Sequence, residues 1–344
     1  MSRWSNRSTS GYCRVIMPNS DLQTFELVSI CIPVFNCEDT VEAAVLSLVN
    51  QDYPNIEVLI SDNGSTDKTA QICEDIQAKN NTVKIYRFSE NQGVSENYKQ
   101  VVRMATGKFI VFGAGDDSWD PAFVRKTLLT LKASQSSVVC MCSVQRQDPD
   151  HNPIDILRFD KKGSPQFQTP LDLMREILLK RNQKGDLVKN NLFIHGIFKV
   201  EAISDAILNL GFERTNERDT LCRVVLYGNF CHLNEVLFAK TIQRESFTSR
   251  NPEDIYSKVK SSRDTIAYSL KTCFGFMRAN QAIFSRQLLA FPLFIILVKA
   301  RIKWLVKHRG YAFMQAYIPD RFYPFIRFVT GKKSRIAIQF SPSI

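Results

Sequence analysis

The fold is decided between Ser29 and Asp117, by three loop sequences: Ile32-Pro33-Val34-Phe35-Asn36, Ser61-Asp62-Asn63-Gly64-Ser65-Thr66-Asp67 and Gly113-Ala114-Gly115-Asp116-Asp117. Each loop follows an apolar run with strand character and precedes a stretch with helical periodicity. In an open α/β sheet, the loops that leave the carboxyl ends of the strands gather in one crevice, where ligands bind. We therefore expect these loops to form one site, and their acidic residues suit a ligand that combines a metal ion with a diphosphate.

Strand-like and helical segments alternate through the first half of the chain. Strands are expected at residues 28–34, 55–60, 83–88, 109–112 and 137–144. Apolar residues recur at helical spacing between these runs, for example from Val41 to Val49. This alternation, with its short connections, predicts an α/β fold in which helices cover a mostly parallel sheet on both faces.

The pattern becomes less regular after Arg146. Residues 147–169 are polar and contain three prolines, which predicts a long loop over the crevice. A helix is expected at 171–179, and a short helix at 220–227 that Gly228 ends. Two strands are expected at 229–233 and 237–242, and residues from about 246 onward are expected to be helical.

Composition indicates a globular protein with a basic C-terminus. The content of 44% hydrophobic and 23% charged residues is ordinary, but the net charge of +11 is concentrated after residue 285, where eleven Lys and Arg accompany one acid, Asp320. Nine cysteines without a CxxC pair argue against a zinc site. Cys31, Cys140 and Cys142 lie in apolar runs and are expected as small buried residues in a reducing compartment.

The basic C-terminus has a membrane interpretation. The longest uncharged apolar run, at 288–298, has 11 residues and contains Pro292, whereas about 20 residues are needed to cross a bilayer. Residues 286–335 combine cations with aromatic side chains, which is typical of a segment that lies on an anionic membrane surface. The alternative is a helical pair that packs on the domain and exposes a basic face. The polar residues 1–26 lack the apolar core of a secretory signal and are expected to be disordered.

Asp116 and Asp117 follow the fourth expected strand in a glycine-rich turn. Carboxylates in this place can hold a divalent cation, which in turn neutralises a diphosphate. An exposed acidic turn without a ligand is the plain alternative. A dinucleotide-binding turn is disfavoured, because the third glycine of that motif is Ser118 here and the turn does not follow the first strand.

Asp62 ends the second expected strand, where it could accept a hydrogen bond from a nucleobase imide or a ribose hydroxyl. Asn63, Gly64 and Ser65 then supply a tight turn and a helix N-terminus, which attracts anions. A plain capping turn explains Gly64 and Ser65 but not Asp62, because a carboxylate at the end of a buried strand needs a partner.

Acidic residues also begin the short helix of the second half, at Glu217 and Asp219. A carboxylate there can deprotonate an incoming hydroxyl, although acids are common at helix N-termini for electrostatic reasons alone. Arg223 can pair with Asp219 across one helical turn. For His195, which stands in an apolar stretch, a core position is favoured over a catalytic one.

These residues resemble a known family, the inverting glycosyltransferases of family 2, which share the GT-A fold. The matching segments are 28–36, 47–51, 60–67, 91–93 and the Gly-Asp-Asp-x-x-x-Pro sequence that ends at Pro121. The match is strong over residues 27–135, weaker to residue 245 and absent beyond. Motifs in this order and at this spacing are far more specific than any one of them alone.

The resemblance implies a role for each site residue. The implied nucleotide pocket, with Asp62 facing the base, consists of Pro33, Val34, Phe35, Asn36, Asp62, Asn63, Gly64, Asn91, Gly93 and Asp116. Asp116 is implied as the ligand of Mn²⁺ or Mg²⁺, with Asp117 beside it, although Ala114 replaces the first acid of the DxD-type motif. The implied general base is Glu217, with Asp219 as the second choice. Lys240 and Arg244 lie where a cation approaches the leaving diphosphate.

The resemblance also implies a domain organisation and a reaction. A GT-A (Rossmann-like) α/β/α sandwich is expected at 27–245, with a nucleotide-sugar-binding half at 27–135 and an acceptor and catalytic-base half at 136–245. A helical, basic and aromatic region at 246–344 would follow. The expected reaction moves a sugar from a nucleotide-diphosphate sugar, with a UDP-sugar as first choice, to an acceptor hydroxyl with inversion. The expected acceptor is a saccharide or lipid-linked glycan in cell-envelope or extracellular polysaccharide synthesis, at the cytoplasmic face of a membrane.

Other functions stay open. A nucleotidyltransferase would need a phosphate loop rich in glycine and cations, which residues 33–39 lack. A basic aromatic tail could bind nucleic acid, but no recognisable module is present, and no nucleic-acid partner is expected. The main alternative is a non-catalytic scaffold with a degenerate GT-A domain that binds a nucleotide or a membrane surface. Ala114 is the residue that favours it.

Overall fold

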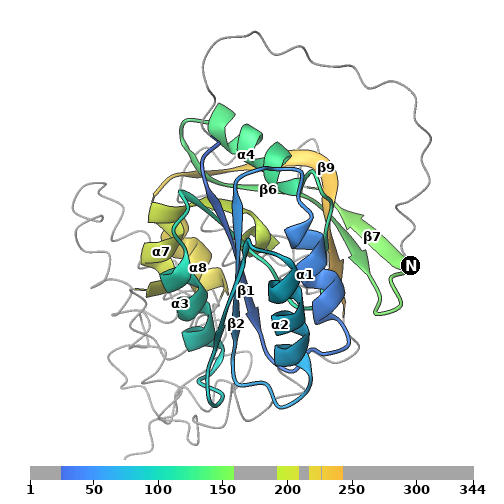
Figure 1. The fold of residues 1–344 in the computed structure, drawn as a ribbon. Helices are drawn as coiled ribbons and strands as arrows, with labels where there is room; N and C mark the ends of the chain where they lie inside the picture. Colours follow the sequence, from blue (N-terminus) through green and yellow to red (C-terminus); the bar gives the residue numbers. More distant parts are fainter. Residues whose placement is uncertain (1–24, 159–191, 209–216, 226, 243–344) are drawn as a thin grey trace, which may run out of the picture.

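The computed structural model describes residues 25–158, 192–208, 217–225 and 227–242 (Figure 1). These residues build a nine-stranded sheet with the strand order β3-β2-β1-β4-β8-β6-β9-β5, and β7 pairs with β6. The strands are β1 (Val28–Val34), β2 (Ile56–Asp62), β3 (Val83–Arg87), β4 (Phe109–Phe112), β5 (Ser118–Trp119), β6 (Ser137–Gln147), β7 (Pro153–Leu157), β8 (Ile197–Lys199) and β9 (Asn229–Thr241).

The sheet is mixed. β1 pairs in parallel with β2 and β4, and β2 pairs in parallel with β3. Antiparallel pairs begin at β8, which lies between β4 and β6, and include β5 with β9 and β7 with β6. β6 and β9 are again parallel. The expected α/β sandwich is confirmed, with more antiparallel pairing in its second half than a mostly parallel sheet implies.

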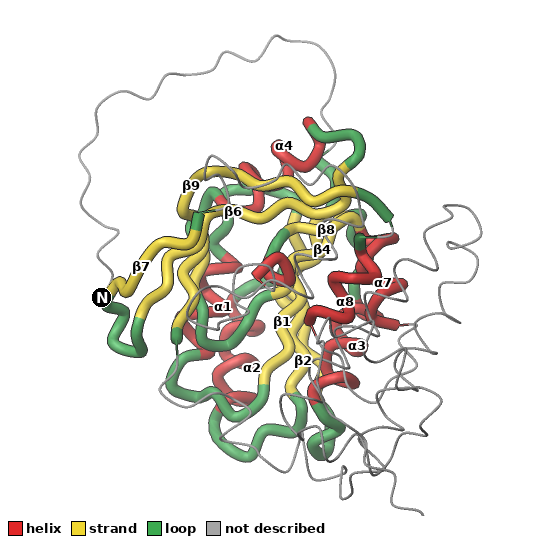
Figure 2. Tube along the Cα trace, turned by 180° about the vertical axis from the view of Figure 1, so that it is seen from behind, coloured by secondary structure: helices red, strands yellow, loops and turns green. Residues whose placement is uncertain are grey.

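Helices cover both faces of the sheet. On one side of β1 and β2 lie α1 (Val41–Val49) and α2 (Thr69–Lys79), and on the other lie α3 (Val94–Met104), α7 (Val200–Leu208) and α8 (Glu217–Val224) (Figure 1). Figure 2 shows the same arrangement from behind. α4 (Phe123–Ala133) packs against β6 and β9, and a 3-10 helix, Leu192–His195, precedes β8. Within the described ranges, no helix has the length and apolar character that a membrane span requires.

The central strands are continuous apolar runs because both of their faces are covered. Every residue of β4 is buried, and so is every residue of β1 except Pro33. The buried Glu57 of β2 is satisfied within this core: Ser29 Oγ, the Thr106 backbone N and Thr106 Oγ1 donate to its Oε1 at 2.8, 2.8 and 2.7 Å. Lys84 Nζ lies 3.2 Å from the other oxygen, Oε2. This carboxylate therefore joins β1, β2, β3 and the turn before β4.

Three features of the second half differ from the sequence-based expectation. Residues 153–157, expected in a long loop, form the edge strand β7, which accepts Pro153 as its first residue because a strand's first position tolerates proline. α8 begins at Glu217 and not at residue 220. The two strands expected at 229–233 and 237–242 are one strand, β9, whose register against β6 shifts between Leu233 and Val236. The expected turn is thus an irregularity within a strand.

Some expectations lie outside the described residues: the helix at 171–179, Arg244, residues 1–24 and the region 246–344. Phe25 and Glu26, which the expected boundary placed in the disordered N-terminus, are instead held on the domain. Asn55 Nδ2 donates to the Phe25 carbonyl (2.5 Å), and the Tyr53 hydroxyl donates to the Glu26 carbonyl (2.8 Å).

Candidate active site

The loops that follow β1 and β2 are joined by reciprocal hydrogen bonds between side chains and backbone. The Asn36 backbone N donates to Ser65 Oγ (3.0 Å), and the Thr66 backbone N donates to Asn36 Oδ1 (2.9 Å). Asn36 has a φ of 44°, a left-handed conformation that asparagine tolerates better than most residues. The first two of the three loops are therefore side by side, as predicted.

The same contact continues along both loops. The Cys37 backbone N donates to Thr69 Oγ1 (2.8 Å), and the Glu38 backbone N donates to Asp67 Oδ2 (3.1 Å). In return, the Lys68 backbone N donates to Glu38 Oε2 (2.9 Å). Together with the Asn36–Ser65 bonds, these contacts form what we call the β1–β2 loop clamp, residues 36–38 and 65–69. The clamp fixes both loops without a ligand.

The loop after β3 is attached to the loop after β2 through two asparagines. Asn63 Nδ2 donates to Asn91 Oδ1 (2.8 Å), while the backbone N atoms of Gln92 and Gly93 donate to Asn63 Oδ1 (2.9 Å) and Asn91 Oδ1 (2.7 Å). Gly64 has a φ of +70°, and a Cβ there would lie 2.7 Å from the Glu90 carbonyl carbon. Asn63, Gly64, Asn91 and Gly93 thus lie together, and Gly64 is required by its backbone conformation.

Asp62 is the last residue of β2 and has no exposed surface. Other residues of the chain supply its hydrogen-bond and ion-pair partners. The Ser65 backbone N donates to Asp62 Oδ1 (3.1 Å), and Ser65 Oγ donates to the same oxygen. Arg87 Nε lies 3.2 Å from Asp62 Oδ2. A partner for Asp62 was expected from the sequence, and Arg87 is that partner. Sequence alone could not identify Arg87, because the pair depends on the register that sets Arg87 opposite Asp62 on the parallel strand β3.

The third loop lies against the first. A Cβ on Gly115 would lie 2.7 Å from Cys37 Sγ, so the turn that carries Asp116 packs directly on the β1–β2 loop clamp. Pro33, Val34 and Phe35 lead into that clamp from β1, and Asn97 Nδ2 of α3 donates to the Val34 carbonyl (3.1 Å). The expected meeting of the loops after β1, β2 and β4 is therefore present.

Asp116 and Asp117 have different surroundings. Asp117 is buried, and its two oxygens accept hydrogen bonds from Lys240 Nζ (2.8 Å) and from the Thr241 backbone N (2.9 Å). Asp116 is only half-buried. Asp117 therefore attaches the third loop to the end of β9, and Lys240, expected near a diphosphate, is joined to the same loop.

His195 lies next to this third loop. It is buried, its ring centroid is 5.1 Å from that of Phe238, and its Nδ1 atom has no hydrogen-bond partner. Burial lowers the pKa of His195 to about 3, and the positive charge of Lys240 acts in the same direction. His195 is therefore neutral at physiological pH, which agrees with the core position that the sequence favoured.

The two candidate bases lie outside the part of the structure that describes side chains. Only their backbone is placed, in the first turn of α8. Arg223 of the same helix can pair with Asp219, whose side chain is not described, and it pairs with Asp205 of α7, with Nη2 3.2 Å from Oδ2. Arg223 has no exposed surface, so this ion pair buries a charge between α7 and α8 and fixes the helix that carries Glu217.

The donor atoms available to a metal are few. In the described ranges, no group of three or more His, Cys, Asp and Glu side chains could hold a metal ion. Ala114 supplies no ligand, and the Asp117 oxygens already accept two hydrogen bonds. At this loop, the protein can offer a divalent cation one carboxylate, that of Asp116. A ligand and water would fill the other coordination positions.

The fold and the loop cluster define an α/β protein whose acidic site lies at the carboxyl ends of parallel strands. The family model "Glycosyl transferase family 2" matches residues 29–200, half of the chain, and the chain belongs to this family. The family expected from the loop motifs is confirmed.

The curated relatives match this chain over only part of their own length. An uncharacterized glycosyltransferase of Haemophilus influenzae is 38% identical over 91 residues, which are 26% of this chain and 36% of that protein. WfaP of Escherichia coli, named a UDP-Glc:alpha-D-GlcNAc-diphosphoundecaprenol beta-1,3-glucosyltransferase, is 37% identical over 94 residues, 27% of this chain and 37% of that protein. The chain thus spans little more than a third of the length of these relatives.

A solved structure shows the same fold. S. aureus TarS 1–349 in complex with UDP-GlcNAc superposes with a TM-score of 0.50 at 18% identity, and the match covers 89% of this chain and 87% of that one. At this identity the likeness concerns the fold alone, and it agrees with the expected GT-A architecture.

Proposed function

We propose that this chain moves a sugar from a nucleotide-diphosphate sugar, with a UDP-sugar as the first candidate, to an acceptor hydroxyl, with inversion at the anomeric carbon. One observation carries the proposal: the loops after β1, β2 and β4 are fixed against one another and bring Asp62 and Asp116 to the same edge of the sheet. Membership of glycosyl transferase family 2 supports transferase chemistry at this edge.

Nucleotide binding is assigned to the residues that these loops hold together: Pro33, Val34, Phe35, Asn36, Asp62, Asn63, Gly64, Asn91, Gly93 and Asp116. Asp62 has no exposed surface, and Ser65 and Arg87 occupy its oxygens. A base that contacts Asp62 therefore has to replace one of these partners. The Arg87 side chain is 51% exposed and is the partner that can move aside.

Asp116 is proposed to hold Mn²⁺ or Mg²⁺ together with the nucleotide. A single carboxylate, without a second acid at Ala114, fits a cation that binds through diphosphate oxygens more than through the protein. When bound, the cation offsets negative charge on the leaving diphosphate. Asp117 would then act indirectly, because it fixes the loop and holds Lys240 close to it.

Glu217, or Asp219 in its place, is proposed to take the proton from the acceptor hydroxyl as that oxygen attacks the anomeric carbon. Both residues begin α8, whose position depends on the buried Arg223–Asp205 ion pair. A base on a helix that is anchored in this way keeps its place while acceptors exchange.

A lipid-linked or other envelope glycan is the proposed acceptor. WfaP is named as a glucosyltransferase that acts on alpha-D-GlcNAc-diphosphoundecaprenol. The basic and aromatic residues 286–335 suit contact with the anionic cytoplasmic face of a membrane, where such acceptors are embedded.

A donor screen tests the proposal. Full-length protein, Mn²⁺ or Mg²⁺, a panel of nucleotide sugars and a membrane extract would be assayed for released nucleoside diphosphate. We expect release with one donor, and a loss of about two to four orders of magnitude in Asp116→Asn and Glu217→Gln. Asp75→Asn, on the exposed side of α2, is the matched charge control and should leave the rate unchanged.

The screen distinguishes an error in the role of a single residue from an error in the class of function. If Glu217→Gln retains full turnover and Asp219→Asn does not, Asp219 is the base. If no donor is turned over and no nucleoside diphosphate binds, the enzyme assignment is wrong and the scaffold alternative takes its place.

A further inference from the structure

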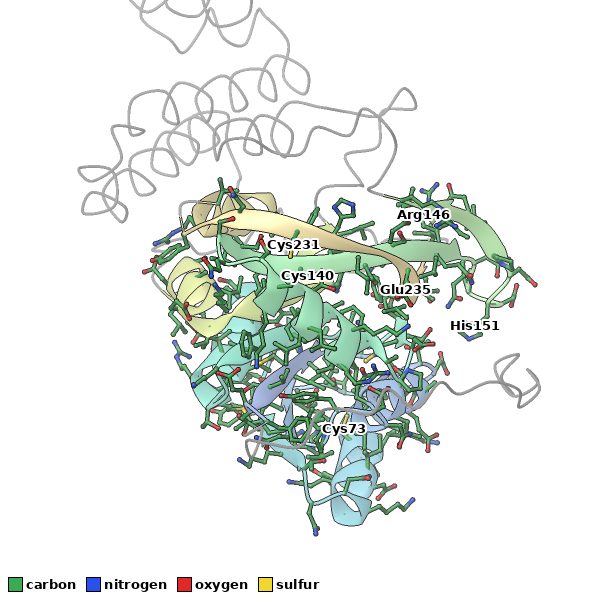
Figure 3. All side chains as sticks on the ribbon, turned by 90° about the horizontal axis from the view of Figure 1, so that it is seen from above. Cys73, Cys140, Arg146, His151, Cys231 and Glu235 are labelled. Carbon is green, nitrogen blue, oxygen red and sulfur yellow. The ribbon has the colours of Figure 1, made fainter. Side chains whose placement is uncertain are left out.

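The described residues contain a pair of cysteines away from the loop cluster, on neighbouring strands. Cys140 of β6 and Cys231 of β9 are register partners in a parallel pair, so their side chains leave the sheet on the same face (Figure 3). Neighbouring strands lie about 4.8 Å apart, within the range of about 4.4 to 6.8 Å that separates the Cα atoms of a disulfide. Both residues are free thiols in this structure.

We propose that Cys140 and Cys231 are a thiol pair that a small-molecule disulfide oxidises to an intrachain disulfide. Each thiol donates to a backbone carbonyl of β6: Cys231 Sγ to Val139 (3.4 Å) and Cys140 Sγ to Met141 (3.8 Å). Cys140 has no exposed surface, whereas Cys231 is half-buried. The geometry therefore gives the two thiols different roles: Cys231 meets the reagent, and Cys140 completes the reaction inside the sheet.

The electrostatics support this division of roles. The neighbouring Cys140 thiol lowers the pKa of Cys231, and the positive charge of Lys199 acts in the same direction. By contrast, burial raises the pKa of Cys37 and of Cys142 to about 12. Since the thiolate is the attacking form, Cys231 should react before either of these cysteines.

The thiol–disulfide exchange proceeds in two steps, in which atoms and electrons balance. The Cys231 thiolate attacks one sulfur of the small-molecule disulfide, an S–S bond forms, and the other half leaves as a thiolate. The Cys140 sulfur then attacks the Cys231 sulfur of this mixed disulfide, and the second small thiol departs with the Cys140 proton. Two protein thiols lose two electrons in total, and the reagent is reduced to two thiols.

Peptide mapping tests the proposal on the full chain. Folded protein would be treated with oxidised glutathione, alkylated, digested with trypsin without reduction and analysed by mass spectrometry. The cleavage sites place Cys140 and Cys142 in residues 133–146 and Cys231 alone in residues 224–240. We expect these two peptides to be linked. Cys231→Ser should abolish the link, and Cys140→Ala should leave glutathione attached to Cys231.

Control variants make the assignment specific. Cys37→Ser removes another half-buried thiol and should not change the linked product, and Cys142→Ser should also retain it. A link that disappears in Cys142→Ser would overturn the proposal, and so would wild-type protein that shows no linked pair under conditions that modify Cys231 in the urea-unfolded chain. The wild-type result does not depend on whether any variant folds.

Discussion

At the scale of single residues, Asp116 and Asp117 show how adjacent carboxylates acquire different tasks. Lys240 and Thr241 occupy the oxygens of Asp117, while Asp116 stays half-buried beside the clamp. We predict that Asp117→Asn lowers the free energy of unfolding by about 1–3 kcal/mol, because an amide cannot accept both hydrogen bonds. Asp116→Asn should remove transfer, because Asp116 is the proposed metal ligand.

Urea unfolding of Asp117→Asn and of the wild type checks the predicted loss of stability. A stable Asp117→Asn protein would show that the bonds to Lys240 and Thr241 contribute little.

The carboxyl group of Glu57 leads to a prediction of how the stability of the protein depends on pH. Burial raises its pKa, but hydrogen bonds from Thr106, Ser29 and Lys84 outweigh burial and hold the pKa of this carboxyl below its usual value of 4.5. A lowered folded-state pKa stabilises the protein above pH 4.5, and that stabilisation is lost as the pH falls through the folded-state value. Glu57→Gln should therefore lose stability at pH 7 and show a shallower loss as the pH falls below 4.5.

Thermal unfolding across this pH range, with Glu42→Gln on the exposed side of α1 as the control, measures the effect. Parallel pH profiles for the wild type and Glu57→Gln would show that Glu57 does not contribute.

At the scale of elements, the β1–β2 loop clamp holds the two loops of the proposed nucleotide site against each other. Asn36 contributes both a side-chain acceptor and a left-handed backbone, with φ 44°. Asn36→Gly can still adopt the left-handed backbone conformation but lacks the side-chain acceptor. Asn36→Ala lacks the acceptor and adopts that backbone conformation less readily. We predict that the melting temperature and the donor affinity fall in the order wild type, Asn36→Gly, Asn36→Ala, with a loss of about 1 kcal/mol at each step.

Calorimetric titration with the nucleoside diphosphate and a thermal melt test this order. If Asn36→Ala binds and melts like the wild type, the clamp does not preorganise the site.

The sequence predicted the elements whose signal is local. The runs of β1 and β4 are almost entirely apolar because helices cover both faces of the sheet, so their positions follow from composition. The irregularity in β9 could not be predicted, because Asn234 and Glu235 look like a turn until pairing with β6 is known. The Asp62–Arg87 pair required the register of β2 against β3, and the Asp117–Lys240 pair joins residues 123 positions apart.

At the scale of the whole molecule, charge is separated along the chain, with a nearly neutral domain and a basic C-terminus. If residues 286–335 contact an anionic membrane, each cation near the surface contributes about 1 kcal/mol. The double change Lys303→Gln and Lys307→Gln should therefore weaken binding to phosphatidylserine vesicles by roughly 30-fold, and added salt should reduce the difference.

Vesicle co-sedimentation measures this effect. The control changes Lys68 and Lys79, two exposed cations of the domain, to Gln. Equal binding of both double variants would assign the attraction to overall charge and remove the specific role of the C-terminal region.

A nucleotide-diphosphate site that includes Asp116 is the central proposal for this protein, and thermal unfolding with UDP tests it directly. A ligand that binds only the folded state raises the melting temperature. We predict a rise with UDP and Mn²⁺ together, little or none with either alone, and none for Asp116→Asn with both. No rise for the wild type with any nucleoside diphosphate, or an equal rise for Asp116→Asn, would contradict the account.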